Sequence, residues 1–177
     1  MSTIEIRTAL LTDARDIAEV HVQSWRETYR GIIPADYLAS LSVSEREKNW
    51  QNILQANNLA TGTFVAVRED GSMAGFGCCG KQRSAERPAT GEYYAIYVLK
   101  TAQRGGVGRS LMAAMSAHLR TQNLHSALVW VVRENAAARR FYEALGGAYV
   151  TEKEDKSFGF SLWETAYEWQ TLPTMSA

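Results

Sequence analysis

The sequence has few of the residues that build metal sites, disulfides and membrane spans. Its 177 residues include two cysteines, three histidines and three prolines. Cys78 and Cys79 are adjacent, a spacing that fits neither a metal site nor a disulfide, so we expect two reduced, buried thiols and no metal. No run of about 18 apolar residues occurs, so we expect no membrane span. The N-terminus lacks the apolar core of a signal peptide, which favours a cytoplasmic protein.

An excess of one charge is also absent. Nineteen basic and nineteen acidic residues give a formal net charge of zero. Proteins that bind nucleic acid need a basic surface, so we do not expect nucleic acid as the partner. The length suits one domain, which we expect to cover residues 1–172, with residues 173–177 as a flexible tail. A homodimer is left open.

The most informative segment that is present is Gln-Arg-Gly-Gly-Val-Gly at residues 103–108. Glycines let a backbone approach a bulky anion, and a helix that begins near Gly106 offers unpaired N–H groups to it. A P-loop is excluded because no Gly-Lys-Ser/Thr follows, and the dinucleotide fingerprint fails because Leu111 stands where its third glycine belongs. The segment therefore predicts a site for another phosphorylated cofactor; a glycine turn that only caps a helix is the alternative.

Hydrophobic periodicity predicts alternating strands and helices along the chain. The predicted strands are residues 4–6, 64–68, 73–79, 92–99, 127–132, 150–151 and 158–169, and the predicted helices are 12–29, 35–41, 44–56, 106–122 and 136–145. Ser44 and Glu47 match a capping box for the third helix. The crossover through residues 106–122 implies one parallel strand pair. We therefore expect an α/β (α+β) fold with a mixed, mostly antiparallel central sheet of six or seven strands flanked by helices.

Two motifs in this order carry a resemblance to a known family. The loop Gln103-x-x-Gly106-x-Gly108 is followed by a strand and then by Asn135-x-x-Ala138-x-x-Phe141-Tyr142. This pattern resembles the GNAT superfamily of acetyl-CoA-dependent N-acetyltransferases, most densely over about residues 90–150. The resemblance implies central parallel strands that splay apart, acetyl-CoA as the co-substrate, and no metal. It also implies a small-molecule or peptide amine as the acceptor, which attacks the thioester directly in a ternary complex.

The resemblance implies which residues hold the cofactor. The pantetheine arm would pair with backbone groups of the strand before the loop, and the pyrophosphate would lie on the loop itself. The implied cofactor-binding residues are Ile96, Tyr97, Val98, Gln103, Arg104, Gly105, Gly106, Val107, Gly108, Arg109 and Asn135. Asn135 is also a good helix N-cap residue, and the two roles are compatible.

Two residues are implied as catalytic. Tyr142 stands at the position of the family's general acid, and a phenol with a pKa near 10 can protonate a departing thiolate. Glu92, eleven residues before Gln103, stands where one branch of the family has its base. Such a base is needed because an alkylamine is neutral about one time in a thousand at pH 7.4. The alternatives are a core tyrosine and a solvated edge glutamate.

Aromatic residues are the candidates for the acceptor site. Trp25 and Tyr29 follow each other by one helical turn, in the region that roofs the acceptor in the family, and Tyr94 lies on the strand before the loop. Aromatics at helical spacing are more often core, and that alternative stays open. A non-catalytic acyl-CoA sensor on the same fold is the rival function. It would keep the loop and lose the acid, so Tyr142 favours the enzyme.

Overall fold

The computed structural model of the protein describes residues 4–56, 58–83 and 90–175. Seven strands form one sheet in the order β1-β2-β3-β4-β5-β7-β6. They are β1 (Ile4–Thr8), β2 (Gly62–Arg68), β3 (Met73–Lys81), β4 (Gly91–Val98), β5 (Ala127–Val132), β6 (Ala148–Asp155) and β7 (Leu162–Trp169). Only β4 and β5 pair in parallel. The expected mixed, mostly antiparallel sheet is confirmed.

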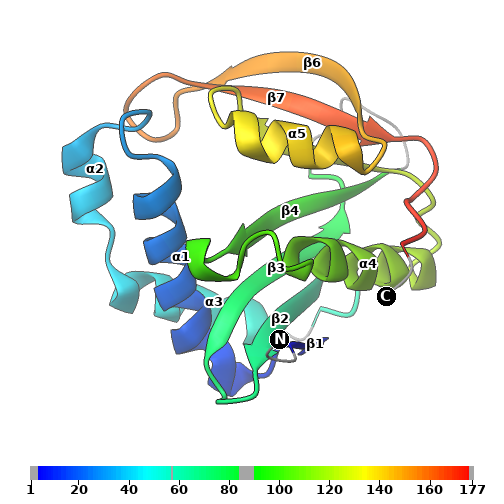
Figure 1. Cartoon of the computed structure of the whole chain (residues 1–177), viewed down its shortest axis with the longest axis horizontal. Helices are drawn as coiled ribbons and strands as arrows, with labels where there is room; N and C mark the ends of the chain where they lie inside the picture. The colour runs from blue at the N-terminus through cyan, green and yellow to red at the C-terminus, as the bar shows by residue number, and fades with distance from the viewer. Residues whose placement is uncertain (1–3, 57, 84–89, 176–177) are drawn as a thin grey trace.

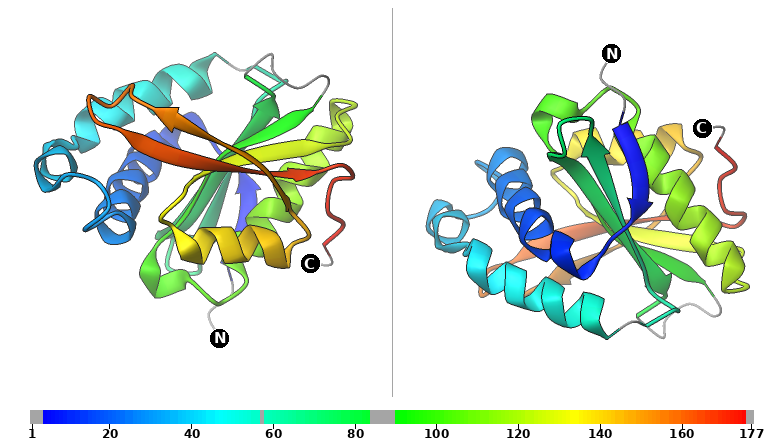
Figure 2. Two further views of the ribbon diagram at one scale, coloured as in Figure 1. Left: turned by 90° about the horizontal axis from the view of Figure 1, so that it is seen from above. Right: turned by 90° about the horizontal axis from the view of Figure 1, so that it is seen from below.

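Helices cover both faces of the sheet. They are α1 (Ala14–Thr28), α2 (Ala35–Ser40), α3 (Val43–Gln55), α4 (Val107–Thr121) and α5 (Ala136–Ala144). Figure 2 shows α1 and α3 on one side of β2 and β3 and α4 on the other. The alternation of a strand explains this, because Val65 packs with α1 and α3 whereas its neighbour Ala66 packs with α4. Helix α5 lies next to α4 and under β6 and β7 (Figure 1).

The central parallel strands separate soon after they meet. They pair at three positions only, Gly91 with Ala127, Glu92 with Leu128 and Tyr93 with Val129. We call these residues the paired end, and residues 95–98 of β4 with 130–132 of β5 the open end. The separation coincides with a bulge in β4, where Cys78 lies opposite Ala95 and Cys79 opposite Tyr93, which leaves Tyr94 extra. The splay implied by the resemblance is confirmed.

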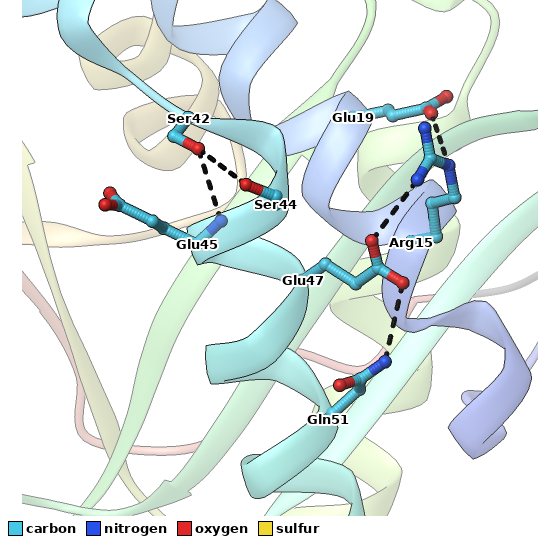
Figure 3. A network of polar contacts seen from close by, with 7 residues as sticks. All are labelled: Arg15, Glu19, Ser42, Ser44, Glu45, Glu47 and Gln51. Carbon is cyan, nitrogen blue, oxygen red and sulfur yellow. Dashed lines mark hydrogen bonds and ion pairs between the residues drawn. The ribbon is translucent and has the colours of Figure 1, made fainter.

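The start of α3 differs from the prediction. Ser42 is the N-cap, and its Oγ accepts a hydrogen bond from the Glu45 backbone N–H at 3.3 Å. The predicted capping box of Ser44 and Glu47 is wrong, because the earlier serine takes the cap and starts the helix at Val43. Glu47 then lies inside the helix, where it accepts from Arg15 of α1 at 3.4 Å and bonds Gln51 (Figure 3).

The C-terminal hairpin is longer than predicted, and hydrogen bonds hold the residues that follow it. β6 spans Ala148–Asp155 instead of residues 150–151, because its polar residues are tolerated on an edge strand. Beyond β7, Leu172 is buried, and its N–H donates to the His125 carbonyl at 2.8 Å. The Arg120 guanidinium donates to the carbonyls of Leu172 and Pro173. Arg120 therefore holds the start of the segment that we expected to be a flexible tail.

Candidate active site

The first turn of α4 forms a cradle for an anion. Its N-cap, Gly106, has φ +84°, and Arg104 has φ +64°, so two left-handed residues turn the chain sharply into the helix. The N–H groups of Val107, Gly108 and Arg109 have no acceptor among the residues that the structure describes. A helix N-terminus with three free donors and the positive end of its dipole can bind a phosphate.

Side chains around this cradle fix its position. Gln103 donates from Nε2 to the Val98 carbonyl at 3.0 Å, which ties the loop to the last residue of β4. The Val107 side chain is buried, so only its backbone is open to a ligand. A Cβ on Gly108 would meet the Phe141 ring of α5 at 3.3 Å, so this glycine lets α4 and α5 approach closely. Arg104 and Arg109 stay exposed at the rim.

Tyr142 lies on the cradle side of the open end, beneath the rings of Phe141, Tyr167 and Trp169. Its side chain is buried, and its hydroxyl makes no hydrogen bond within the described ranges of the chain. Burial, and then the neighbouring Tyr97, raise the pKa of its phenol above the ordinary value of 10. A phenol that keeps its proton and has no partner among the described residues is suited to donate to a ligand.

Asn135 caps α5 with its side chain. Its Oδ1 accepts from the Ala138 N–H at 3.1 Å, which is the N-cap role weighed from the sequence. The side-chain NH₂ is not used in that bond and faces the Tyr29 hydroxyl, where it acts against the rise in pKa caused by burial. The N-cap role is therefore seen in the structure, and the cofactor role stays a prediction.

Three phenols from distant parts of the chain meet at the open end. Tyr29 comes from the end of α1, Tyr97 from β4 and Tyr142 from α5. Burial, and then Tyr97, raise the pKa of Tyr29, and Tyr142 adds to the rise while Asn135 opposes it. Burial also raises the pKa of Tyr97, whose ring stacks on His21 at 5.0 Å. The predicted Tyr29 and Tyr142 thus share Tyr97 as a neighbour, whose side chain the sequence analysis had left unassigned.

An aromatic wall flanks these phenols on the α1 side. The Trp25 ring lies 5.1 Å from Tyr29, 6.4 Å from Tyr37 and 5.8 Å from Phe158, and Phe160 lies 5.1 Å from Tyr37. We call Trp25, Tyr37, Phe158 and Phe160 the aromatic wall. Only Trp25 was predicted, because the other three lie on α2 and in the β6–β7 turn, where no motif marks them. The Trp25 indole N–H is buried without a hydrogen-bond partner in the described structure.

Glu92 and Tyr94 lie near the paired end and are both engaged with Arg83. Glu92 accepts from the Arg83 backbone N–H at 2.9 Å, from Nε at 3.1 Å and from the terminal nitrogen at 2.5 Å, and 3% of its side chain is exposed. The same guanidinium lies 4.4 Å from the centre of the Tyr94 ring. The Tyr94 hydroxyl donates to the Lys81 carbonyl. Burial, and then Glu92, raise the pKa of Tyr94 to about 12. The two predicted residues thus form one closed cluster.

Glu164 of β7 is an acidic residue that the sequence analysis missed. It pairs with Val132 at the end of β5, and its Oε2 lies 3.5 Å from the Lys153 ammonium. Burial raises the pKa of its carboxyl, and Lys153 acts against the rise. No motif surrounds this residue, so only the fold places it at the open end.

Neither a metal cluster nor a membrane helix is found in the described part of the chain. No group of three or more His, Cys, Asp or Glu side chains there could hold a metal ion. Among the helices of that part, none is both long and apolar enough to cross a membrane.

Comparison with known proteins gives a consistent result. The model of the acetyltransferase (GNAT) family matches residues 21–147. The uncharacterized N-acetyltransferase YuaI of Bacillus subtilis (strain 168) is 40% identical over 172 residues, which cover 97% of this chain and 96% of YuaI. The mycothiol acetyltransferase of Paenarthrobacter aurescens (strain TC1) is 36% identical over 99 residues, 55% of this chain and 30% of that protein.

Solved structures show the same fold. The YncA acetyltransferase of Salmonella typhimurium, solved with acetyl-CoA, has a TM-score of 0.72 at 24% identity, covering 99% of this chain and 98% of its own. The PaiA N-acetyltransferase of Thermoplasma acidophilum, solved with coenzyme A, has a TM-score of 0.71 at 21% identity, covering 92% and 98%. At these identities the likeness concerns the fold.

Proposed function

This chain belongs to the GNAT acetyltransferase family, and on that premise we propose that it transfers the acetyl group of acetyl-CoA to a primary amine of a small molecule or peptide. The observation that carries the proposal is the open end of β4 and β5 beside the free N–H groups of α4. A chain of amides ending in a pyrophosphate matches these two features together.

Acetyl-CoA would bind along the open end of β4 and over the N-terminus of α4. Pantetheine amides would pair with the backbone of Ile96, Tyr97 and Val98, as an added strand pairs with a sheet edge. The pyrophosphate would lie on the N–H groups of Val107, Gly108 and Arg109, with the positive end of the α4 dipole behind it. Arg104 and Arg109 would face the phosphates from the exposed rim of the loop.

The chemistry proposed is direct attack of the amine on the thioester. Backbone N–H groups at the open end of β4 would polarise the carbonyl, and Tyr142 would protonate the departing sulfur. A route through an acetylated cysteine is disfavoured by burial. Both cysteines are buried on β3, and burial, and then Cys78, raise the pKa of Cys79 to about 12. A thiol in that state supplies little of the thiolate nucleophile.

The amine also has to lose a proton, and Glu92 is the base predicted from the sequence. Because Arg83 binds both of its oxygens, this role requires Arg83 to release them when the acceptor enters. The variant Glu92→Gln keeps the shape and removes the basicity. If Glu92 is the base, kcat/KM should fall at neutral pH and recover in part at higher pH, with acetyl-CoA binding unchanged. An unaltered pH–rate profile would remove Glu92 from the chemistry.

The function as a whole is tested by cofactor binding followed by turnover. Thermal unfolding should show stabilisation by acetyl-CoA and none by NAD. Release of the free thiol of coenzyme A, followed over a panel of primary amines, should then identify the acceptors. Stabilisation by NAD alone would contradict the proposal. Stabilisation by acetyl-CoA without thiol release for any amine would point to the acyl-CoA sensor.

A further inference from the structure

We propose that Glu164 is the carboxylate that binds the acceptor as an ammonium and takes up its proton, and that the acceptor carries this ammonium on an apolar or aromatic group. The inference rests on the proposed acetyl transfer and adds to it the acceptor side of the site. It is carried by the position of Glu164, by what surrounds it, and by how little of its carboxylate is already bound.

The register of β7 places Glu164 at the open end. It lies opposite Val132, three residues beyond Val129, where the pairing of β4 with β5 stops. Tyr167 of the same strand points toward α5, where its hydroxyl donates to Glu143 at 2.6 Å. Because side chains alternate along a strand, Glu164 points to the opposite face. That face also carries Leu162, which packs with Trp25 and Tyr29.

The carboxylate therefore lies on the acceptor side, and Tyr142 on the cofactor side. The charge of Glu164 reaches the phenols of Tyr29 and Tyr97, since it contributes to the raised pKa of both. Tyr97 is also the neighbour that raises the pKa of Tyr142 after burial. In acyl transfer the base and the acid act on atoms bonded to one carbonyl carbon, so they must reach one point from different elements. Glu164 on β7 and Tyr142 on α5 come from different elements, and both have Tyr97 as a neighbour.

Glu164 is also the less occupied of the two carboxylates. Glu92 accepts three hydrogen bonds from Arg83 and is 3% exposed. Glu164 is 20% exposed, and its ion pair with Lys153 is long at 3.5 Å. Lys153 is itself 44% exposed, and an ion pair with one well-exposed partner is weakened by solvent. An acceptor ammonium can therefore replace Lys153 at small cost, whereas reaching Glu92 requires breaking a buried ion pair.

The surroundings suit a cation on an apolar carrier. The charged groups that act on Glu164 are Lys153, Asp155 and Arg83, and the Lys153 ammonium already lies 4.0 Å from the centre of the Trp130 ring. An aromatic face that accepts one ammonium can accept another. The aromatic wall packs with Leu162, which shares the face of Glu164, so an apolar group attached to the ammonium would lie against it.

The proposed transfer exchanges the C–S bond of the thioester for a C–N bond and moves two protons of the ammonium. The bound ammonium gives one proton to Glu164, and its freed lone pair forms the C–N bond with the thioester carbonyl. The C–S bond breaks, and the thiolate takes the phenolic proton of Tyr142. The second proton of the amine nitrogen restores Tyr142, and the proton on Glu164 leaves to solvent through its exposed edge. The products are the amide, coenzyme A as the thiol, and one proton.

The test uses phenethylamine as the acceptor and 2-phenylethanol as the matched compound without an amine. Phenethylamine should stabilise the complex of the protein with coenzyme A against heat, and 2-phenylethanol should do so less. The variant Glu164→Gln should lose the difference between the two compounds. If the wild type shows no difference, or if Glu164→Gln keeps it, the proposal is wrong.

Turnover supplies the second readout. Glu164→Gln should lower kcat/KM for phenethylamine at pH 7 by about 10²–10⁴, the range for losing a general base, and raising the pH should recover part of the loss. Glu152→Gln is the matched control, because Glu152 lies on the neighbouring β6 and bonds Thr165 on the α5 side. A loss confined to Glu92→Gln would overturn the proposal. Failure of acetyl-CoA to stabilise any variant or the wild type would instead count against the proposed function.

Discussion

The paired end and the open end of β4 and β5 are built from the same two strands and differ in what their polar groups bind. At the paired end the strands bond to each other, and Glu92, Tyr94 and Arg83 bind one another nearby. At the open end the strands leave backbone groups unpaired, and Tyr142 has no hydrogen-bond partner in the described structure. Polar groups that have no partner in the described structure can bind a ligand there.

Tyr142→Phe should have the largest effect on the open end. Without the phenolic proton the thiolate leaves unaided, so kcat should fall by about 10²–10⁴ while KM for acetyl-CoA changes little. Steady-state kinetics measure both. Tyr149→Phe is the control, since Tyr149 is 59% exposed on the edge strand β6. If Tyr142→Phe and the wild type have equal kcat, Tyr142 is only a core residue. The open end then has no catalytic acid that the paired end lacks.

Gly106→Ala tests the cradle that belongs to the open end. Gly106 and Gly71 both have positive φ, +84° and +83°, and a Cβ on either meets no atom within 4 Å, so alanine strains both equally. Acetyl-CoA at one hundred times its Kd should stabilise the wild type and Gly71→Ala by about 2.7 kcal/mol. Gly106→Ala should lose most of this gain in thermal unfolding. Retention of the full gain would mean that the loop is only a turn.

Arg83→Met tests whether the paired end is a structural cluster. It removes the guanidinium bonds to Glu92 Oε1 and leaves that buried oxygen unpaired, while the backbone N–H of residue 83 still donates to Oε2. The free energy of unfolding should fall by about 1–3 kcal/mol. Urea denaturation measures the loss, and the double variant Arg83→Met with Glu92→Gln should regain part of it. No loss of stability, together with higher activity, would favour Glu92 as the base that Arg83 holds back.

The pH dependence of the wild-type rate is the smallest expected effect, and it reports on the two groups proposed to move protons. Since the pKa of Tyr142 is raised above 10, kcat should not fall through loss of its proton below pH 10. The pKa of Glu164 is also raised, so kcat/KM should decline on the acid side at a pH above that of an ordinary glutamate, because the base must be ionised. A decline near pH 4 that persists in Glu164→Gln would assign the acid limb to another group.

The prediction from sequence succeeded where the signal is local. Hydrophobic periodicity and the run of glycines predicted the strand before the loop, the loop itself and the helix after it. The structure has β4 and α4 within a few residues of the predicted bounds. It failed at the α3 cap, because Ser42 and Ser44 offer the same hydroxyl and only the helix start decides between them. It missed most of the β6 strand because polar residues on an edge strand have no hydrophobic period to read.

By itself the sequence determined the family, the mixed sheet and the glycine loop before α4, because these depend on residues close together in the chain. Only the tertiary structure decided which of the two carboxylates is less tightly bound by a neighbouring cation. Glu92 lies on a strand that also faces Arg83, so its oxygens are taken, whereas Glu164 lies 72 residues further along and reaches the open end through the order β5-β7-β6. Strand order and register bring distant residues together, and neither can be read from spacing along the chain.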